Sequence, residues 1–353
     1  MSRLLESPVG GLTYEAAGVS IEAGDEAIER IKSVVASTDR PGVLGGIGGF
    51  GGMFRLDTAK YARPVLVASA DGVGTKLEVA RLVDRYDTIG LDLVAMLVDD
   101  LACVGAEPLF LLDYVAVGKL DPARLHDVVA GVAAGCRRSG AALLGGETAE
   151  HGGVLREDDL DVAGFAVGVV EEGDELGAHR VREGDLIVGF ASPGLRSNGY
   201  TLARRALLDR ESRLDEPAWQ GATTSLADEL LRPSVIYSPA VVAIRAELAG
   251  AVHAVAHVTG GGIVGNVPRA LPAHLDATID MSAFATPEIF FEIQRRGRVA
   301  AAEMVRVFNC GLGMTVMLDA NAAEAAIDLA RANGVEATVV GEVVTGKKKV
   351  RLQ

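Results

Sequence analysis

The sequence predicts an α/β protein, with α+β character and mixed sheets, and three observations lead to this prediction. Short apolar runs rich in β-branched residues alternate with segments whose apolar residues recur at helical spacing. Glycine clusters follow several of these runs and allow tight backbone turns. The length of 353 residues suits roughly two domains of about 150 residues each. We expect an N-terminal domain at 1–173 and a C-terminal domain at 174–353.

In the first half of the chain, apolar spacing predicts four helices and four strands. Three helices are expected over 25–37, 88–104 and 121–139, and a further helix opens at Lys76. Asp25 and Asp121 are the expected N-caps of the first and third. A short β-branched run bounded by Pro64 predicts a buried strand at 65–68. The other strands are expected at 109–117, 141–144 and 162–170.

The second half repeats the pattern of strand, glycine turn and helix. Strands are expected at 185–190, 252–258 and 315–318, followed by two terminal strands. Helices are expected over 200–208, 236–248, 263–271 and 322–332.

Charge and composition exclude several functions. The net charge of −14 argues against a nucleic-acid surface, which needs a basic field. A polyanionic substrate must then be met locally by lysine, arginine, metal ions and backbone amides. No apolar run reaches the ~20 residues that span a bilayer, and the N-terminus lacks a secretory apolar region. We expect a cytoplasmic protein whose three scattered cysteines are small buried residues in a reducing compartment.

The segment Pro64 to Leu77 is the first candidate site. An apolar run leads into Asp71-Gly72-Val73-Gly74-Thr75-Lys76, after which helical spacing begins. A strand, a glycine turn and a helix start together favour the binding of anionic groups. An acid and a base five residues apart suggest a metal–phosphate site. The alternative is a simple turn with a surface ion pair.

Three further features fit phosphate or metal chemistry. Lys32 falls on the apolar stripe of its helix, so it either snorkels at the stripe's edge or points inward at phosphate. The glycine-rich loop 45–51 lacks the flanking strand and helix of a dinucleotide site, which leaves a mobile flap or a linker. Asp92, Asp99 and Asp100 interrupt an apolar helix, where buried carboxylates are costly unless paired or metal-bound; the alternative is that they form one solvated edge of the helix.

Nine stretches together resemble one family. They are T-Y-E-A-A-G-V-S-I-E-A-G-D (13–25), G-G-I-G-G-F-G (45–51), D-G-V-G-T-K (71–76), D-T-I-G-L-D-L-V-A-M (87–96), G-A-E-P-L-F-L-L-D-Y (105–114), G-G-E-T-A-E (145–150), S-N-G-Y (197–200), A-H-V-T-G-G-G (256–262) and F-N-C-G-L-G-M (308–314). In this order they resemble the phosphoribosylformylglycinamidine cyclo-ligase (aminoimidazole ribonucleotide synthetase, AIR synthase) family. The resemblance covers essentially residues 13–345.

The resemblance implies a fold and a reaction. The fold is the AIR-synthetase-like two-domain fold, in which the sheet of the N-terminal domain joins two copies as a homodimer. The reaction is an ATP-dependent ring closure with Mg²⁺, in which ATP phosphorylates the formyl oxygen of formylglycinamidine ribonucleotide. A nitrogen of the same substrate then attacks, and phosphate departs. Positioning and charge neutralisation are expected to dominate both steps.

The resemblance also implies residue roles. Asp71, Asp100 and Glu147 are expected to hold magnesium, and Lys32, Asp100 and Glu147 to be catalytic. ATP is expected to contact Lys32, Gly46, Gly48, Gly49, Asp71, Gly72, Thr75, Lys76 and Asp100. The ribonucleotide is expected to contact Gly146, Glu147, Thr148, Arg196, Ser197, Asn198, Thr259, Gly260, Gly261 and Asn309.

Some questions stay open at this point. Arg196 stands where some members have histidine, so phosphate contact fits it better than acid–base chemistry. Asp99 stands where asparagine is expected in some members, so either Asp99 or Asp100 could bind metal. His257 is either structural or functional. The rivals are a selenophosphate synthetase, a thiamin-phosphate kinase and a catalytically inactive nucleotide-binding protein, but no cysteine precedes Cys103 as the first of these requires.

Overall fold

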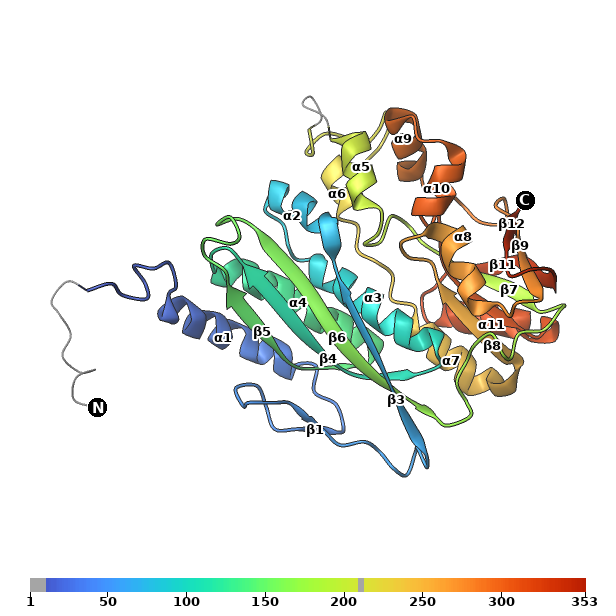
Figure 1. The fold of residues 1–353 in the computed structure, drawn as a ribbon, viewed down its shortest axis with the longest axis horizontal. Helices are drawn as coiled ribbons and strands as arrows, with labels where there is room; N and C mark the ends of the chain where they lie inside the picture. The colour runs from blue at the N-terminus through green and yellow to red at the C-terminus, as the bar shows by residue number, and fades with distance from the viewer. Residues whose placement is uncertain (1–10, 209–212) are drawn as a thin grey trace.

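A computed structural model describes residues 11–208 and 213–353, and it contains two large sheets with helices packed against them (Figure 1), together with a small two-stranded sheet. The N-terminal half consists of α1 (Ile21–Ala36), β1 (Val43–Leu44), β2 (Met53–Phe54), β3 (Pro64–Gly72), α2 (Leu77–Val83), α3 (Ile89–Cys103), β4 (Glu107–Val117), α4 (Pro122–Ser139), β5 (Ala142–Glu150) and β6 (Leu160–Glu171). The predicted α/β class with mixed sheets is confirmed.

The C-terminal half holds the larger sheet. Its elements are β7 (Leu186–Ala191), α5 (Tyr200–Leu207), α6 (Leu226–Leu230), α7 (Ser238–Leu248), β8 (Val252–His257), α8 (Gly262–Asn266), β9 (Leu275–Ile279), α9 (Glu288–Gly297), α10 (Ala301–Val307), β10 (Leu312–Leu318), α11 (Ala323–Ala332), β11 (Ala337–Thr345) and β12 (Val350–Leu352). The strand order is β12-β9-β11-β7-β10-β8, and only the β12–β9 pair is parallel. Both faces carry apolar clusters, which explains why β8 and β10 are buried along their whole length.

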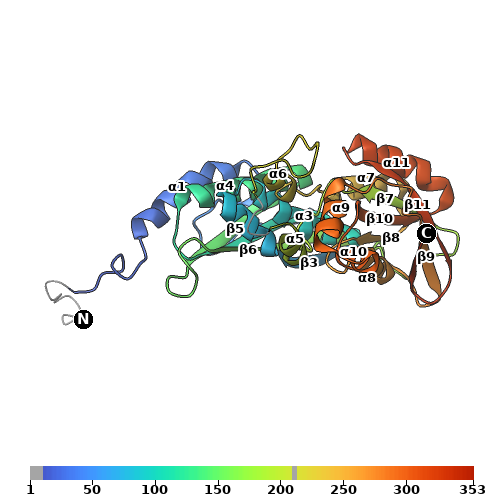
Figure 2. The ribbon, with the colours of Figure 1, turned by 90° about the horizontal axis from the view of Figure 1, so that it is seen from above.

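The N-terminal sheet is covered by helices on one face only. Its strand order is β3-β6-β4-β5, and α3 and α4 pack against the covered face, with α1 beside α4 near β5 (Figure 2). On the other face, cross-strand neighbours leave large apolar side chains in solvent: Leu66 is 63% exposed, Phe165 51% and Leu112 36%. An apolar patch of this kind on a single chain is typical of an interaction surface.

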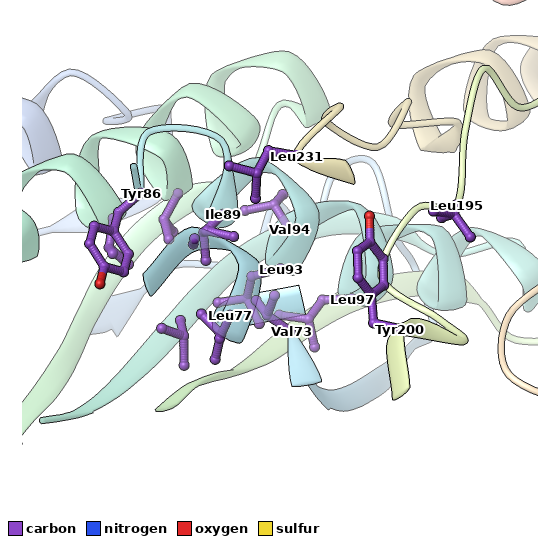
Figure 3. Packing of buried hydrophobic residues seen from close by; sticks show 14 of the residues in the cluster. Val73, Leu77, Tyr86, Ile89, Leu93, Val94, Leu97, Leu195, Tyr200 and Leu231 are labelled. Atoms are coloured by element: carbon purple, nitrogen blue, oxygen red, sulfur yellow. The ribbon is translucent and has the colours of Figure 1, made fainter. Parts of the chain in front are cut away.

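The two halves share one hydrophobic core. Figure 3 shows Leu93 and Leu97 of α3 packed in a cluster that also contains Leu195, Tyr200 and Leu231 from the C-terminal half. This packing holds the loop after β7 and the helix α5 against the N-terminal domain. The division of the chain at 173/174 stays a prediction, because the core is continuous across it.

Several local predictions were wrong in detail. Helix α1 begins at Ile21 because the Ser20 hydroxyl accepts the backbone N–H of Ala23, so Asp25 is not the N-cap. Strand β3 extends to Gly72 and alternates between exposed and half-buried residues, because only one sheet face is covered. Within the described residues, no helix is both long and apolar enough to cross a membrane.

Asp113 is a carboxyl on the covered face, opposite Gly146 on β5 and Gly164 on β6. Burial raises its pKa to about 7, whereas aspartate in an unfolded chain has a pKa of about 3.9. Between these values the folded state holds a proton that the unfolded state has lost. The free energy of unfolding therefore falls as pH rises from about 4 to about 7, by at most ~1.4 kcal/mol per pH unit from this group.

The substitution Asp113→Asn removes this titration. We expect the variant to exceed the wild type in free energy of unfolding at pH 8, and the difference to shrink at pH 5. Chemical denaturation at the two pH values measures it. An equal difference at both pH values would contradict the assignment.

Candidate active site

Asp71 and Asp100 lie close together where β3 approaches the end of α3. Asp71 is the penultimate residue of β3, and Asp100 lies in the last turn of α3 with its side chain 47% exposed. Burial raises the pKa of Asp71, and the negative charge of Asp100 raises it further. Neighbouring carboxylates that repel one another are the oxygen ligands that Mg²⁺ prefers. The donor set therefore fits a magnesium ion.

His257 links Asp100 to a buried network. His257 ends β8, and its Nδ1 lies 2.9 Å from Asp100 Oδ1. Its Nε2 lies 2.9 Å from Nη2 of Arg196, which also donates to Asp99 Oδ2 at 2.8 Å. The guanidinium of Arg196 is buried and packs over the ring of Tyr237 at 4.6 Å. The predicted contact between Arg196 and substrate does not fit this geometry, because the guanidinium is used inside the protein.

Asp99 and its neighbour Asp100 have different surroundings. Asp99 is fully buried, and its Oδ1 accepts the backbone N–H groups of Tyr237 and Ser238 at 2.8 Å each, at the start of α7. Its other oxygen accepts a hydrogen bond from Arg196, so both oxygens of Asp99 are occupied by groups of the protein itself. The partly exposed Asp100 is the better candidate for metal binding.

The loops after β7 and β8 meet beside this pair. Ser197 Oγ and Asn198 Oδ1 are buried and have no hydrogen-bond partner among the described residues. A Cβ atom on Gly260 would lie 3.7 Å from the side-chain amide of Asn198, so the segment Thr259–Gly261 lies next to that loop. Buried polar atoms without partners are costly in a native protein unless a ligand or water satisfies them. The predicted substrate residues of the first loop, Ser197 and Asn198, therefore lie next to those of the second. These are Thr259 and Gly260, followed in sequence by Gly261.

Asn309 supports the same loop from behind. Its buried amide donates to the Gly194 carbonyl at 3.0 Å and accepts the Gly311 N–H at 2.8 Å. The prediction that Asn309 contacts substrate does not fit, because the nitrogen and the oxygen of its side-chain amide both form hydrogen bonds with backbone groups. Its role is to fix the segment that leads into Arg196.

Lys76 is buried instead of facing the Asp71 turn. Its ammonium forms an ion pair with Asp92 at 2.5 Å and donates to the carbonyls of Arg196 and Arg232 at 3.2 and 2.8 Å. The prediction that Lys76 neutralises phosphate does not fit, since its three donors are used. The neighbouring Thr75 is exposed, and its hydroxyl lies 3.1 Å from that of Thr201.

Glu147 lies at the opposite edge of the sheet from Asp71. In the register of the sheet, Gly72 aligns with Glu147 across β6 and β4, three strand spacings away. At about 4.8 Å per spacing this separates the backbones of the two edge strands by roughly 14 Å at this level of the sheet. Within one chain the predicted site of three metal-binding carboxylates is therefore not formed. Glu147 and its neighbours Gly146 and Thr148 lie on β5 instead.

Lys32 and the glycine loop lie on the same side as β5. A pocket between α1 and the loop that joins β1 to β2 is lined by Lys32, Gly46, Leu144 and other residues. Lys32 is exposed and forms an ion pair with Glu29 one turn away. Gly48 and Gly49 lie in the same exposed loop. The predicted residues thus fall into two half-sites, one at each edge of the N-terminal sheet.

Comparisons with known proteins agree with the motifs. Residues 56–170 match the family described as AIR synthase related protein, N-terminal domain, and residues 182–353 match its C-terminal domain. The chain is 50% identical over 338 residues to the phosphoribosylformylglycinamidine cyclo-ligases of Anaeromyxobacter dehalogenans (strain 2CP-C) and Anaeromyxobacter sp. (strain K). Each match covers 95% of this chain and 96% of the relative. The chain belongs to the phosphoribosylformylglycinamidine cyclo-ligase family.

Solved structures share the fold of this cyclo-ligase family chain. Thiamine-monophosphate kinase from Stenotrophomonas maltophilia K279a has a TM-score of 0.66 at 21% identity, covering 93% of this chain and 96% of its own. The hydrogenase maturation protein HypE, solved in complex with ATP, has a TM-score of 0.64 at 18% identity, covering 98% and 92%. At these identities the likeness concerns the fold. The family matches and cyclo-ligase relatives do not favour the rival kinase or selenophosphate synthetase.

Sequence reasoning missed the structural roles of two carboxylates in this cyclo-ligase family chain. Asp92 pairs with Lys76 and accepts the N–H and hydroxyl of Ser234, and Asp99 caps α7. The available signal was the apolar character of α3 on all sides, which requires any carboxylate on it to find a partner. The partners come from distant parts of the sequence, so they could not be named.

Proposed function

We propose that the protein closes the imidazole ring of aminoimidazole ribonucleotide from formylglycinamidine ribonucleotide, using ATP and releasing ADP and phosphate, in de novo purine synthesis. The observation that carries this proposal is the Asp71–Asp100 pair beside loops with unpartnered polar atoms, in a chain that is 50% identical to cyclo-ligases. A ligase of this kind needs a site for charged phosphates next to a site for a ribonucleotide.

The chemistry has two parts. The formyl oxygen takes the γ-phosphoryl group of ATP, and ADP leaves. A nitrogen of the same substrate then attacks the activated carbon, phosphate departs with that oxygen, and one proton is lost. Phosphoryl transfer of this type depends on position and charge more than on covalent participation of the protein. The protein therefore has to hold the two substrates in line and keep water away.

Asp71 and Asp100 would hold magnesium. When bound, the ion would supply positive charge next to phosphate oxygens. Two solved structures of the same fold hold nucleotides. HypE is in complex with ATP, and T. maritima PurL is complexed with AMPPCP, the latter with a TM-score of 0.52 at 16% identity, covering 92% of this chain and 47% of its own. These complexes support the proposal that the present chain binds ATP.

The ribonucleotide would bind at the loops after β7 and β8. Ser197 Oγ and Asn198 Oδ1 offer polar atoms that nothing in the described chain satisfies. The segment Thr259–Gly261 adds backbone that is accessible because two of its residues are exposed glycines. Gly261 has a left-handed backbone with φ +99°, a conformation that glycine adopts readily and other residues rarely do.

A homodimer would complete the site. The open sheet face carries Leu66, Leu112 and Phe165, which a second copy would cover. Each chain has one half-site at the β3 edge and another at the β5 edge, so a sheet-to-sheet dimer would bring Asp71 of one copy towards Glu147 of the other. Lys32 and the glycine loop, which lie on the side of β5, would then act with the partner's Asp100.

The test is ADP release by the purified protein with formylglycinamidine ribonucleotide, ATP and Mg²⁺, with the imidazole product measured in parallel. We expect ADP and product in equal amounts, and none when the ribonucleotide is omitted. Thiamine monophosphate in place of the ribonucleotide should give no ADP. Release of ADP with thiamine monophosphate, or ADP without imidazole product, would overturn the proposal.

A further inference from the structure

We infer that Arg196 and His257 act together as positioning residues for Asp100, with Arg196 reinforcing the tautomer of His257 that holds the carboxylate. This inference rests on the proposed role of Asp100 in metal binding. Neither residue touches substrate in this assignment. The observation behind it is a continuous series of contacts from the start of α7 to the site: Asp99, Arg196, His257 and Asp100.

The tautomer follows from donor and acceptor chemistry. Arginine can only donate, so the 2.9 Å contact between Arg196 Nη2 and His257 Nε2 requires a lone pair on Nε2. In a neutral ring the proton is then on Nδ1, and it points at Asp100 Oδ1, 2.9 Å away. A proton on Nε2 would face the guanidinium donor directly. The carboxylate of Asp100 can only accept, so it requires the same tautomer, and Arg196 reinforces that tautomer from the other side of the ring.

Arg196 is itself held rigidly. Its Nη2 carries two hydrogens, which serve Asp99 Oδ2 and His257 Nε2, and its Nη1 donates to the Val235 carbonyl at 2.9 Å. Its backbone has a φ of +64°, a left-handed conformation that is uncommon for a residue with a side chain. Such strain persists only where the surroundings fix the residue strongly. The ring of Tyr237 below the guanidinium provides part of that support.

The arrangement matters because Asp100 would otherwise be free to turn away. Its side chain is partly exposed, and the neighbouring Asp71 carries the same charge. Mutual repulsion favours rotamers of Asp100 that point into solvent. The hydrogen bond from His257 Nδ1 keeps one oxygen of Asp100 in place. Outer partners of metal ligands commonly change metal affinity by about 10–100-fold.

Two substitutions of His257 separate the ring nitrogens. His257→Asn places an amide nitrogen near the Nδ1 position and can still donate to Asp100. His257→Gln reaches the Nε2 position and can meet Arg196, but it leaves Asp100 without this donor. We expect the dissociation constant for Mn²⁺, measured by electron paramagnetic resonance with a non-hydrolysable ATP analogue present, to stay within about threefold for His257→Asn. For His257→Gln we expect it to rise about tenfold or more.

A second readout is independent of metal and of activity. In ¹⁵N-histidine-labelled wild type, the ring signals that disappear in His257→Asn should be those of a neutral Nδ1–H tautomer. In Arg196→Met, Asp99 Oδ2 loses its arginine partner and lies 3.9 Å from His257 Nε2, so the ring signals should gain Nε2–H character. Equal Mn²⁺ affinities for the Asn and Gln variants, or an Nε2–H tautomer in the wild type, would overturn the inference. Failure of the proposed function would show differently, as wild-type protein that forms no imidazole product while the tautomer result stands.

Discussion

Asp100→Asn is expected to lower kcat with formylglycinamidine ribonucleotide by more than about 100-fold, since even outer partners of a metal ligand affect metal affinity or activity by 10–100-fold. The variant keeps the size of the side chain but loses the charge. Because the charge of Asp100 raises the pKa of Asp71, its removal also relieves repulsion between the two carboxylates. The melting temperature should therefore not fall. Steady-state kinetics over a magnesium titration, together with thermal unfolding, measure both effects.

The neighbouring variant Asp99→Asn supplies the contrast. Asp99 is buried and accepts Arg196 and two backbone N–H groups, so an amide there would place donors against donors. We expect a clear loss of stability for Asp99→Asn. Asp328→Asn on the surface of α11 is the matched control, and it should change neither property. A full loss of magnesium dependence in Asp99→Asn with normal activity in Asp100→Asn would reverse the assignment.

Lys76→Met is expected to reduce the free energy of unfolding by about 3–5 kcal/mol, the usual cost of removing one member of a buried ion pair. The substitution leaves Asp92 charged and fully buried, and it removes the bridges to the carbonyls of Arg196 and Arg232. Those bridges hold the C-terminal half to the N-terminal domain. Urea denaturation measures the loss.

The double variant Lys76→Met/Asp92→Asn should recover most of that loss. The asparagine oxygen can still accept the Ser234 N–H, and no isolated charge remains. On the surface, Arg30→Met breaks an exposed pair with Glu26 and should cost less than about 1 kcal/mol. If Lys76→Met instead kept its stability and raised only the KM for ATP, Lys76 would be a phosphate ligand after all.

The sequence predicted those helices whose position is decided by residues close together in the chain. The apolar run and spacing at 88–104 predicted α3, and Asp121 with Pro122 predicted the start of α4, because caps and periodicity are properties of neighbouring residues. The expectation that buried carboxylates of α3 need partners is confirmed for Asp92 and Asp99, and metal binding at Asp100 stays a prediction. Which alternative holds for each depends on Ser234, Tyr237 and His257, more than 130 residues away.

The arrangement of the site could not be predicted in the same way. The motifs that contain Asp71 and Glu147 were both expected to follow short strands, and sequence alone does not give the order of those strands in a sheet. The observed order β3-β6-β4-β5 places them at opposite edges. The burial of Lys76 could not be predicted either, because the groups that enclose it come from the loops around Arg196 and Arg232. The elements α9, α10 and β9 were missed outright.

Subunit complementation tests the central claim most directly, namely that two copies share each active site. Asp100→Asn and Glu147→Gln proteins would be purified separately, each with little activity, and then mixed under conditions that exchange subunits. If Asp100 of one copy works with Glu147 of the other, each mixed dimer contains one intact site, and activity should return to about a quarter of the wild-type value. No recovery, with exchange confirmed by differently labelled subunits, would contradict a shared site.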